Sequence, residues 1–123
     1  MHLEQEPGAP AAATIDFEDF LKVDIRLGTV VDVQVYAGAR HPSLKLRIDF
    51  GPAIGVKKSC AQIASLYAPD DLVGRQIAAV VNFPPRQVGK AMSEVLTLGF
   101  ADEQGQVVLF SPDSAVPDGA RLL

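Results

Sequence analysis

Alternating apolar and polar positions predict that β-strands form most of this chain. In residues 44–50 every even position is apolar and every odd position is charged, which is typical of a strand buried on one face. Residues 25–35 also alternate, and a change of phase along them predicts a β-bulge at Gly28. Residues 76–82 are a mostly apolar run between Gly74 and a proline pair, which predicts a strand buried on both faces.

Three shorter segments, residues 56–59, 93–100 and 106–110, predict further strands. Residues 102–105 have the composition of a hairpin turn and join the last two of them. The strands therefore follow one another at short intervals.

Two short helices complete the predicted elements. Residues 16–21 start with acidic residues, which favour a helix N-terminus, and place Phe17, Phe20 and Leu21 on one face. Residues 61–67 carry apolar side chains at helical spacing and stop before a proline. Because a helix as short as the first is marginal alone, its apolar face must dock on something.

This order of elements predicts the fold class. Five or six strands, no repeat and no alternation of strand and helix argue for a mainly β protein. We expect a five-stranded barrel of the oligonucleotide-binding (OB) type, with short helices and terminal extensions. The 123 residues suffice for one such domain, which we place at residues 15–123 after a flexible tail at residues 1–14.

Composition limits the class of protein and the cellular location that we expect. Hydrophobic residues are 48% and charged residues 21% of the chain, which excludes disorder along its whole length. No apolar run approaches the ~20 residues of a membrane span, and residues 1–14 lack the features of a signal peptide. Cys60 has no second cysteine to pair with. We therefore expect a cytoplasmic location without membrane insertion.

Charge is distributed unevenly along the chain. The net charge is −4, yet residues 40–90 carry eight basic and three acidic residues. Such a locally basic segment can steer an anionic partner toward one face of the domain. The alternative is that scattered lysines and arginines only keep exposed strand faces soluble.

Candidate catalytic and metal-binding residues are few. His2 lies in the tail, so His41 is the histidine expected to be ordered, and a nucleophilic pair with Cys60 would require the two to meet in space. Neighbouring acids at Asp70 and Asp71 have the pattern of a helix or turn start. No spacing of ligands suits a zinc site, and no glycine-rich phosphate loop is present. We expect neither an enzyme nor a cofactor or metal.

Residues 82–93 are the most promising binding segment. Two prolines stiffen it, so less entropy is lost when a ligand orders it. Basic side chains suited to a polyanion alternate there with apolar side chains suited to a peptide. The alternative is a rigid connector whose Phe83 and Met92 plug the end of the barrel.

Several motifs in this order resemble a known family. They lie at residues 24–30, 46–51, 57–63, 80–86 and 93–99, and the most specific are Asn82-Phe83-Pro84-Pro85-Arg86 and Ser93-Glu94-Val95-Leu96. The pattern resembles the tRNA-binding domain appended to methionyl-tRNA synthetases and, more closely, the free-standing CsaA family of secretion chaperones. The resemblance covers about residue 17 to the C-terminus.

The resemblance implies a homodimer that binds unfolded or export-bound preprotein polypeptides, with the preprotein translocation ATPase as a partner and tRNA as a further ligand. Three sets of residues are candidates on this basis. The peptide set is Phe83, Pro84, Val88 and Met92; the tRNA set is Lys57, Lys58, Asn82, Arg86, Lys90 and Ser93; the dimer set is Phe17, Phe20 and Leu21.

Three hypotheses stay open from the sequence. The first is the chaperone, and the second is a structure-specific tRNA-binding protein that uses a basic band on the barrel. The third is a scaffold or subunit that binds neither ligand. The terminal residues 116–123 could supply the dimer contacts in place of the dimer set, and plain packing into the core of one chain is the alternative to an interface.

Overall fold

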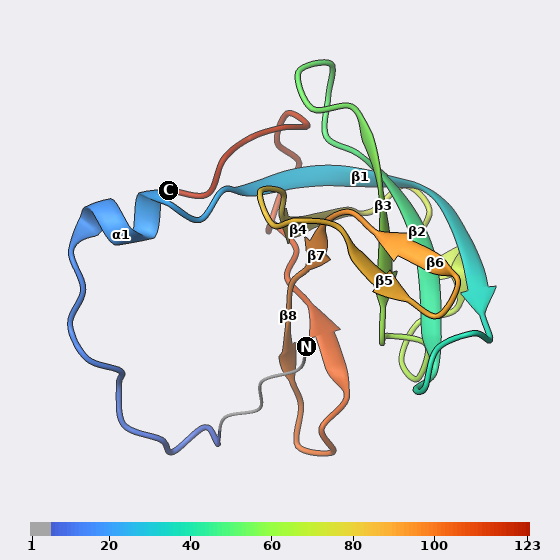
Figure 1. Ribbon diagram of the computed structural model, residues 1–123, viewed down its shortest axis with the longest axis horizontal. Helices are drawn as coiled ribbons and strands as arrows, with labels where there is room; N and C mark the ends of the chain where they lie inside the picture. Colours follow the sequence, from blue (N-terminus) through green and yellow to red (C-terminus); the bar gives the residue numbers. More distant parts are fainter. Residues whose placement is uncertain (1–5) are drawn as a thin grey trace.

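The long strand β1 (Ile25–Tyr36) is the central element of the computed structural model, which describes residues 6–123 (Figure 1). Its first half pairs with β4 and its second half with β2, so β1 bends around the core and curls the sheet. The five-stranded antiparallel sheet has the order β3-β2-β1-β4-β7, and two-stranded sheets β5-β6 and β8-β9 complete the strands. The predicted mainly β architecture, consistent with an OB-like barrel, is confirmed.

The remaining elements are short. They are α1 (Phe17–Leu21), β2 (Ser43–Asp49), β3 (Val56–Ala61), α2 (Pro69–Leu72), β4 (Gln76–Val80), β5 (Arg86–Val88), β6 (Ala91–Ser93), β7 (Leu96–Thr97), β8 (Gly99–Ala101) and β9 (Val107–Leu109). In the described part of the chain, no helix is long and apolar enough to cross a membrane.

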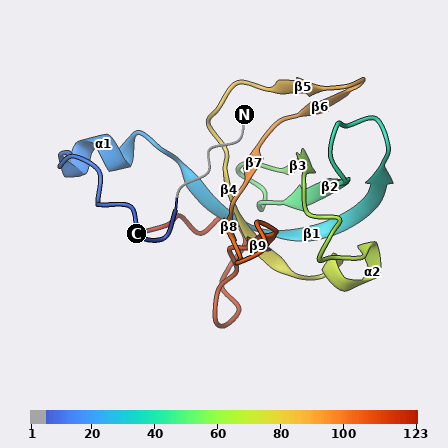
Figure 2. The same cartoon turned by 90° about the horizontal axis from the view of Figure 1, so that it is seen from below.

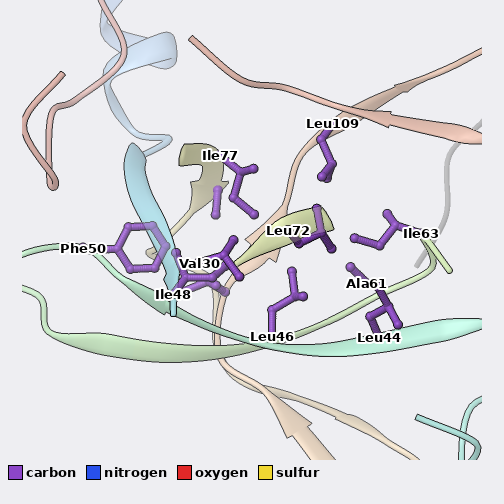
Figure 3. Close-up of a cluster of buried hydrophobic side chains, with 12 residues drawn as sticks. Val30, Leu44, Leu46, Ile48, Phe50, Ala61, Ile63, Leu72, Ile77 and Leu109 are labelled. Atoms are coloured by element: carbon purple, nitrogen blue, oxygen red, sulfur yellow. The ribbon is translucent and has the colours of Figure 1, made fainter. Parts of the chain in front are cut away.

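One cluster of buried aliphatic side chains forms the core, with Phe50 at its edge (Figure 3). Leu44, Leu46 and Ile48 of β2 and the following Phe50 face this cluster, whereas positions 45, 47 and 49 are less buried and face outward, as the alternation predicted. Four consecutive residues of β4, 77–80, are buried, which confirms a strand covered on both faces. Leu72 of α2 is fully buried and closes the cluster.

The β-bulge lies at Val31 and not at Gly28, where the sequence placed it. The pairing of β1 with β2 shifts register between Val30 and Asp32, which leaves Val31 unpaired and exposed. Gly28 serves a different purpose. A Cβ there would lie 2.6 Å from Cγ2 of Ile48, so glycine permits β1 to cross close to β2.

The prediction of a helix at residues 61–67 is wrong. Ile63 and Tyr67 do point toward the core, but the segment forms only one turn, closed by the Tyr67 N–H donating to the Ile63 carbonyl at 3.2 Å. Pro69 disfavours helical geometry in the residue before it and instead begins α2. Asp71 accepts a hydrogen bond from the Ala68 N–H at 3.1 Å, as expected for acids at a helix start.

Two predicted segments are divided further. The strand expected at 93–100 is divided among the end of β6, β7 and β8, and between β7 and β8 the Leu98 N–H donates to the Ala78 carbonyl at 3.0 Å while the Leu98 carbonyl accepts from the Phe110 N–H at 3.1 Å. Residues 82–93, expected as a loop, contain the β5–β6 hairpin. Residues 6–14 are exposed and lie outside the helices and strands, whereas His2 lies outside the described residues. The flexible tail and the domain boundary at residue 15 stay predictions.

Replacing Gly28 by Ala should destabilise the fold, because the new methyl group overlaps β2 and forces a backbone shift. We expect a loss of about 1–3 kcal/mol in the free energy of unfolding, measured by urea denaturation. Gly8→Ala is the matched control, since nothing lies within 4 Å of a Cβ there. Equal urea midpoints for the two variants would contradict this account of Gly28.

Candidate ligand-binding groove

A groove of about 330 Å³ lies between the outer face of β1–β2–β3 and the β5–β6 hairpin. Strand geometry explains its composition. Because Leu44, Leu46 and Ile48 face the core, Lys45 and Arg47 of β2 must face the groove. The hairpin forms the opposite wall through residues 90–92.

Positive charge is concentrated in this groove. Lys45, Arg47, Lys58 and Lys90 line it, and Asp32 is the single acidic side chain among its lining residues. Ion pairs in the described part of the chain are made with Asp19 and Asp24, and none includes a groove cation. The groove lining therefore has a net positive charge and is suited to an anionic ligand.

Cys60 also lines the groove, opposite Lys45 in the β2–β3 register. Burial raises the pKa of its thiol above the usual value of 9.0, and the charges of Lys45 and Lys58 offset only part of that effect. A thiol with a raised pKa is protonated at neutral pH and is a poor nucleophile. His41 lies four residues before Lys45 and does not line the groove with Cys60.

Polar residues at the base of the hairpin attach it to strand β3. The Ser93 hydroxyl accepts a hydrogen bond from the Cys60 N–H at 3.0 Å and donates to the Val95 carbonyl at 3.1 Å. Glu94 bonds the backbone of Lys58 twice, through its N–H at 2.8 Å and its carboxylate at 3.0 Å. Both side chains anchor the hairpin, and Ser93 is buried.

Of the predicted tRNA set, the structure brings Lys58 and Lys90 to the groove. Asn82 lies elsewhere: its side-chain carbonyl accepts from the Asp24 N–H at 2.9 Å, and its amide donates to the Lys22 carbonyl at 2.8 Å. This amide joins the end of β4 to the segment after α1. The other members, Lys57, Arg86 and Ser93, do not line the groove.

The predicted peptide set is dispersed. Met92 lines the groove and is 40% exposed. Phe83, which is 49% exposed, and Pro84 lie before β5 and outside the groove. Val88 is half-buried, and its carbonyl accepts a hydrogen bond from the Tyr36 hydroxyl at 2.6 Å.

Sequence reasoning missed Lys45, Arg47 and Asp32 as site residues. Lys45 and Arg47 count in the basic segment 40–90, but the sequence does not single them out as site residues. A signal was present, because these two cations precede the Lys57-Lys58 pair of the next strand. In the described residues, no group of three or more His, Cys, Asp or Glu side chains could hold a metal ion.

The predicted dimer residues lie on α1, which projects away from the barrel in both Figures 1 and 2. No residue of α1 is buried. Phe17 is 69% exposed, Leu21 is 46% exposed, and Phe20 stacks on Phe17 with ring centroids 5.9 Å apart. Plain packing of these three side chains into the core of one chain is therefore wrong.

Solved structures of similar proteins match over most of the chain. The CsaA chaperone of Bacillus anthracis str. Ames is 49% identical with a TM-score of 0.84, and covers 90% of this chain and 100% of its own. The CsaA chaperone of Picrophilus torridus is 44% identical with a TM-score of 0.82, and covers 89% and 100%. These similarities confirm the resemblance that the motifs indicated.

Sequence relatives point to the same family. The methionine–tRNA ligase of Porphyromonas gingivalis is 39% identical over 114 residues, which are 93% of this chain and 16% of the ligase. This chain thus spans about a sixth of the length of the curated relatives it matches. The family model described as "Putative tRNA binding domain" matches residues 25–121. The chain therefore belongs to this tRNA-binding domain family.

Proposed function

We propose that this protein is a CsaA-type chaperone that binds unfolded or export-bound preprotein polypeptides as a homodimer. The observation that carries the proposal is the similarity to two CsaA chaperones, each covered over its full length at 49% and 44% identity. The methionine–tRNA ligases, in contrast, share only a sixth of their length with this chain.

The groove offers two kinds of contact to an extended polypeptide. Met92 supplies exposed apolar surface inside the groove, and Phe83 supplies it beside the hairpin. The cations of the groove favour clients that carry acidic residues near their apolar segments. Polypeptide binding would therefore combine apolar burial with charge attraction.

A second copy of the chain is the proposed occupant of the apolar face of α1. Phe17 and Leu21 leave that face open to solvent, and Leu123 at the C-terminus is also fully exposed. Apolar side chains gathered on a projecting helix are stabilised when another surface covers them. We therefore place the homodimer contact at α1.

Partners of the chaperone follow from the nature of its clients. A protein that holds export-bound polypeptides has to release them to the export machinery, so we propose the preprotein translocation ATPase as a partner. The same role places the protein in the cytoplasm, where preproteins are made. No catalytic step is needed for this function.

Binding of tRNA is the second candidate function, and the four cations of the groove, none of which is in an ion pair of the described residues, favour it. The family model and the ligase relatives point the same way. Lysine and arginine side chains that contact phosphates release counterions, which gives affinity with a strong salt dependence. In this proposal Lys58 and Lys90 of the predicted tRNA set contact phosphates inside the groove together with Lys45 and Arg47, and Lys57 and Arg86 contact phosphates beside it.

The apolar contribution to peptide binding is tested by Phe83→Ser combined with Met92→Asp. We expect the Kd for a labelled unfolded preprotein-like peptide to rise at least about tenfold, because about 1–2 kcal/mol of apolar burial is lost. Fluorescence anisotropy measures it. Phe100→Ser on β8 is the matched control and should leave the Kd unchanged. Equal affinities in all three proteins would exclude the proposed apolar contacts.

Charge reversal in the groove, Lys45→Glu with Lys58→Glu, tests tRNA binding. We expect the Kd for tRNA to rise more than about tenfold, and the slope of log Kd against log salt to fall by about two. Filter binding over a salt series measures both quantities. Arg75→Glu reverses an exposed cation outside this groove and serves as the control. A salt slope unchanged by the double variant would place the RNA on another surface.

The proposed dimer is tested by Phe17→Asp. Since Phe17 contributes nothing to the core of one chain, the variant should fold normally and elute as a monomer of 13.1 kDa, at half the mass of the wild-type protein. Light scattering after gel filtration measures the mass. Val35→Asp, at an equally exposed position on β1, is the control. A Phe17→Asp protein that keeps the wild-type mass would remove α1 from the interface.

A further inference from the structure

The tip of the β5–β6 hairpin is tied to the barrel by the side chain of Tyr36. Its hydroxyl donates a hydrogen bond to the Val88 carbonyl at 2.6 Å and accepts one from the Lys90 N–H at 3.1 Å. The two bonds hold the hairpin turn on both sides of Gly89. Figure 1 shows this tip beside the end of β1, whose last residue is Tyr36.

This tether is separate from the contacts at the base of the hairpin. Ser93 and Glu94 attach the base to β3. At the tip, Gln87 bonds only within the hairpin, through its amide to the Gly89 carbonyl at 3.0 Å. For the described residues 88–90, the hydrogen bonds that reach the barrel are therefore those to Tyr36. A hairpin fixed at its base and released at its tip can pivot away from the barrel.

Two glycines make space for the Tyr36 hydroxyl. A Cβ at Gly38 would lie 2.5 Å from it, and a Cβ at Gly89 would overlap it and lie 2.6 Å from the Gly38 carbonyl oxygen. Gly89 also has a φ of +60°, which favours glycine. The close contact between the β1–β2 loop and the hairpin turn thus depends on the absence of side chains at both positions.

Tyr36 also contacts a cation on the opposite wall of the groove. The Nζ atom of Lys45 lies 5.5 Å from the centroid of its ring, within the range of a cation–π interaction. One side chain therefore arranges Lys45 on the sheet and Lys90 on the hairpin, and both of these cations line the groove.

We propose that Tyr36 is a positioning residue that holds the hairpin over the groove and thereby fixes the distance between its two basic walls. Tyr36 does not itself line the groove and acts through Lys45, Lys90 and the hairpin backbone. The consequence for affinity rests on the proposed function of the groove. The tether itself does not depend on that function, because it can be measured in the protein without ligand.

Tyr36→Phe tests the tether, because it removes the hydroxyl and keeps the ring that Lys45 contacts. In the ligand-free protein we expect faster exchange of the Lys90 amide hydrogen, and alkylation of Cys60 by iodoacetamide about threefold faster or more as the groove opens. The Kd for tRNA and for the preprotein-like peptide should rise about 3- to 10-fold with the loss of hydrogen bonds that preorganise the site.

Tyr67→Phe is the matched control. The Tyr67 hydroxyl also accepts a backbone N–H, that of Leu109 at 3.1 Å, and its ring also contacts a cation, Arg75 at 5.3 Å, but it lies outside the groove. Tyr67→Phe should lower the free energy of unfolding about as much as Tyr36→Phe does. It should not change Lys90 exchange, Cys60 alkylation or either Kd. Gly89→Ala breaks the same contact from the hairpin side and should reproduce the Tyr36→Phe result.

If Lys90 exchange and Cys60 alkylation are as slow in Tyr36→Phe as in the wild-type protein, Tyr36 does not hold the hairpin and the proposal is overturned. Altered rates with unchanged affinity for both probes would overturn the positioning role. If the wild-type protein binds neither tRNA nor the peptide, the proposed function of the groove fails, and the two ligand-free measurements still decide whether Tyr36 holds the hairpin.

Discussion

The alternation of side chains along β2 is the constraint on which the core and the candidate site both depend. A strand directs successive side chains to opposite faces, so a shift of one residue would exchange the two sets. Leu44 and Leu46 fill the barrel while Lys45 and Arg47 line the groove. Each buried leucine contributes about 1.5–3 kcal/mol, whereas an exposed cation contributes little to folding. Burial of the apolar face therefore holds the cations in place at no cost to the core.

The hairpin turns this basic sheet face into a groove. Backbone groups at the open edge of β3 bond to Ser93 and Glu94, so the base of the hairpin also satisfies strand hydrogen bonds that would otherwise be exposed. The tip depends on the hydroxyl of Tyr36. One wall is thus part of the barrel and the other is an attachment, which lets the ligand-binding surface vary without a change in the core. Such a division suits a family whose members include both synthetase domains and chaperones.

Local patterns in the sequence predicted the strands that bury one or both faces, because periodicity follows directly from burial. They failed where tertiary contacts override them. Ile63 and Tyr67 have helical spacing, yet both enter the core from a single turn that Pro69 ends. Motif similarity supplied Lys58 and Lys90 but not Lys45. The groove forms only when β2 and the hairpin, distant in sequence, come together, and no local pattern encodes that approach.

Protection of Cys60 tests most directly whether ligands occupy this groove. The protein has one cysteine, and it lines the groove opposite Lys45, so iodoacetamide reports on that surface alone. Alkylation is followed by mass spectrometry with and without a saturating preprotein-like peptide, and separately with saturating tRNA. Occupation of the groove predicts that a bound ligand slows alkylation of Cys60 severalfold. If alkylation of Cys60 is unchanged although the ligand is bound, the ligand occupies another surface and the account is contradicted.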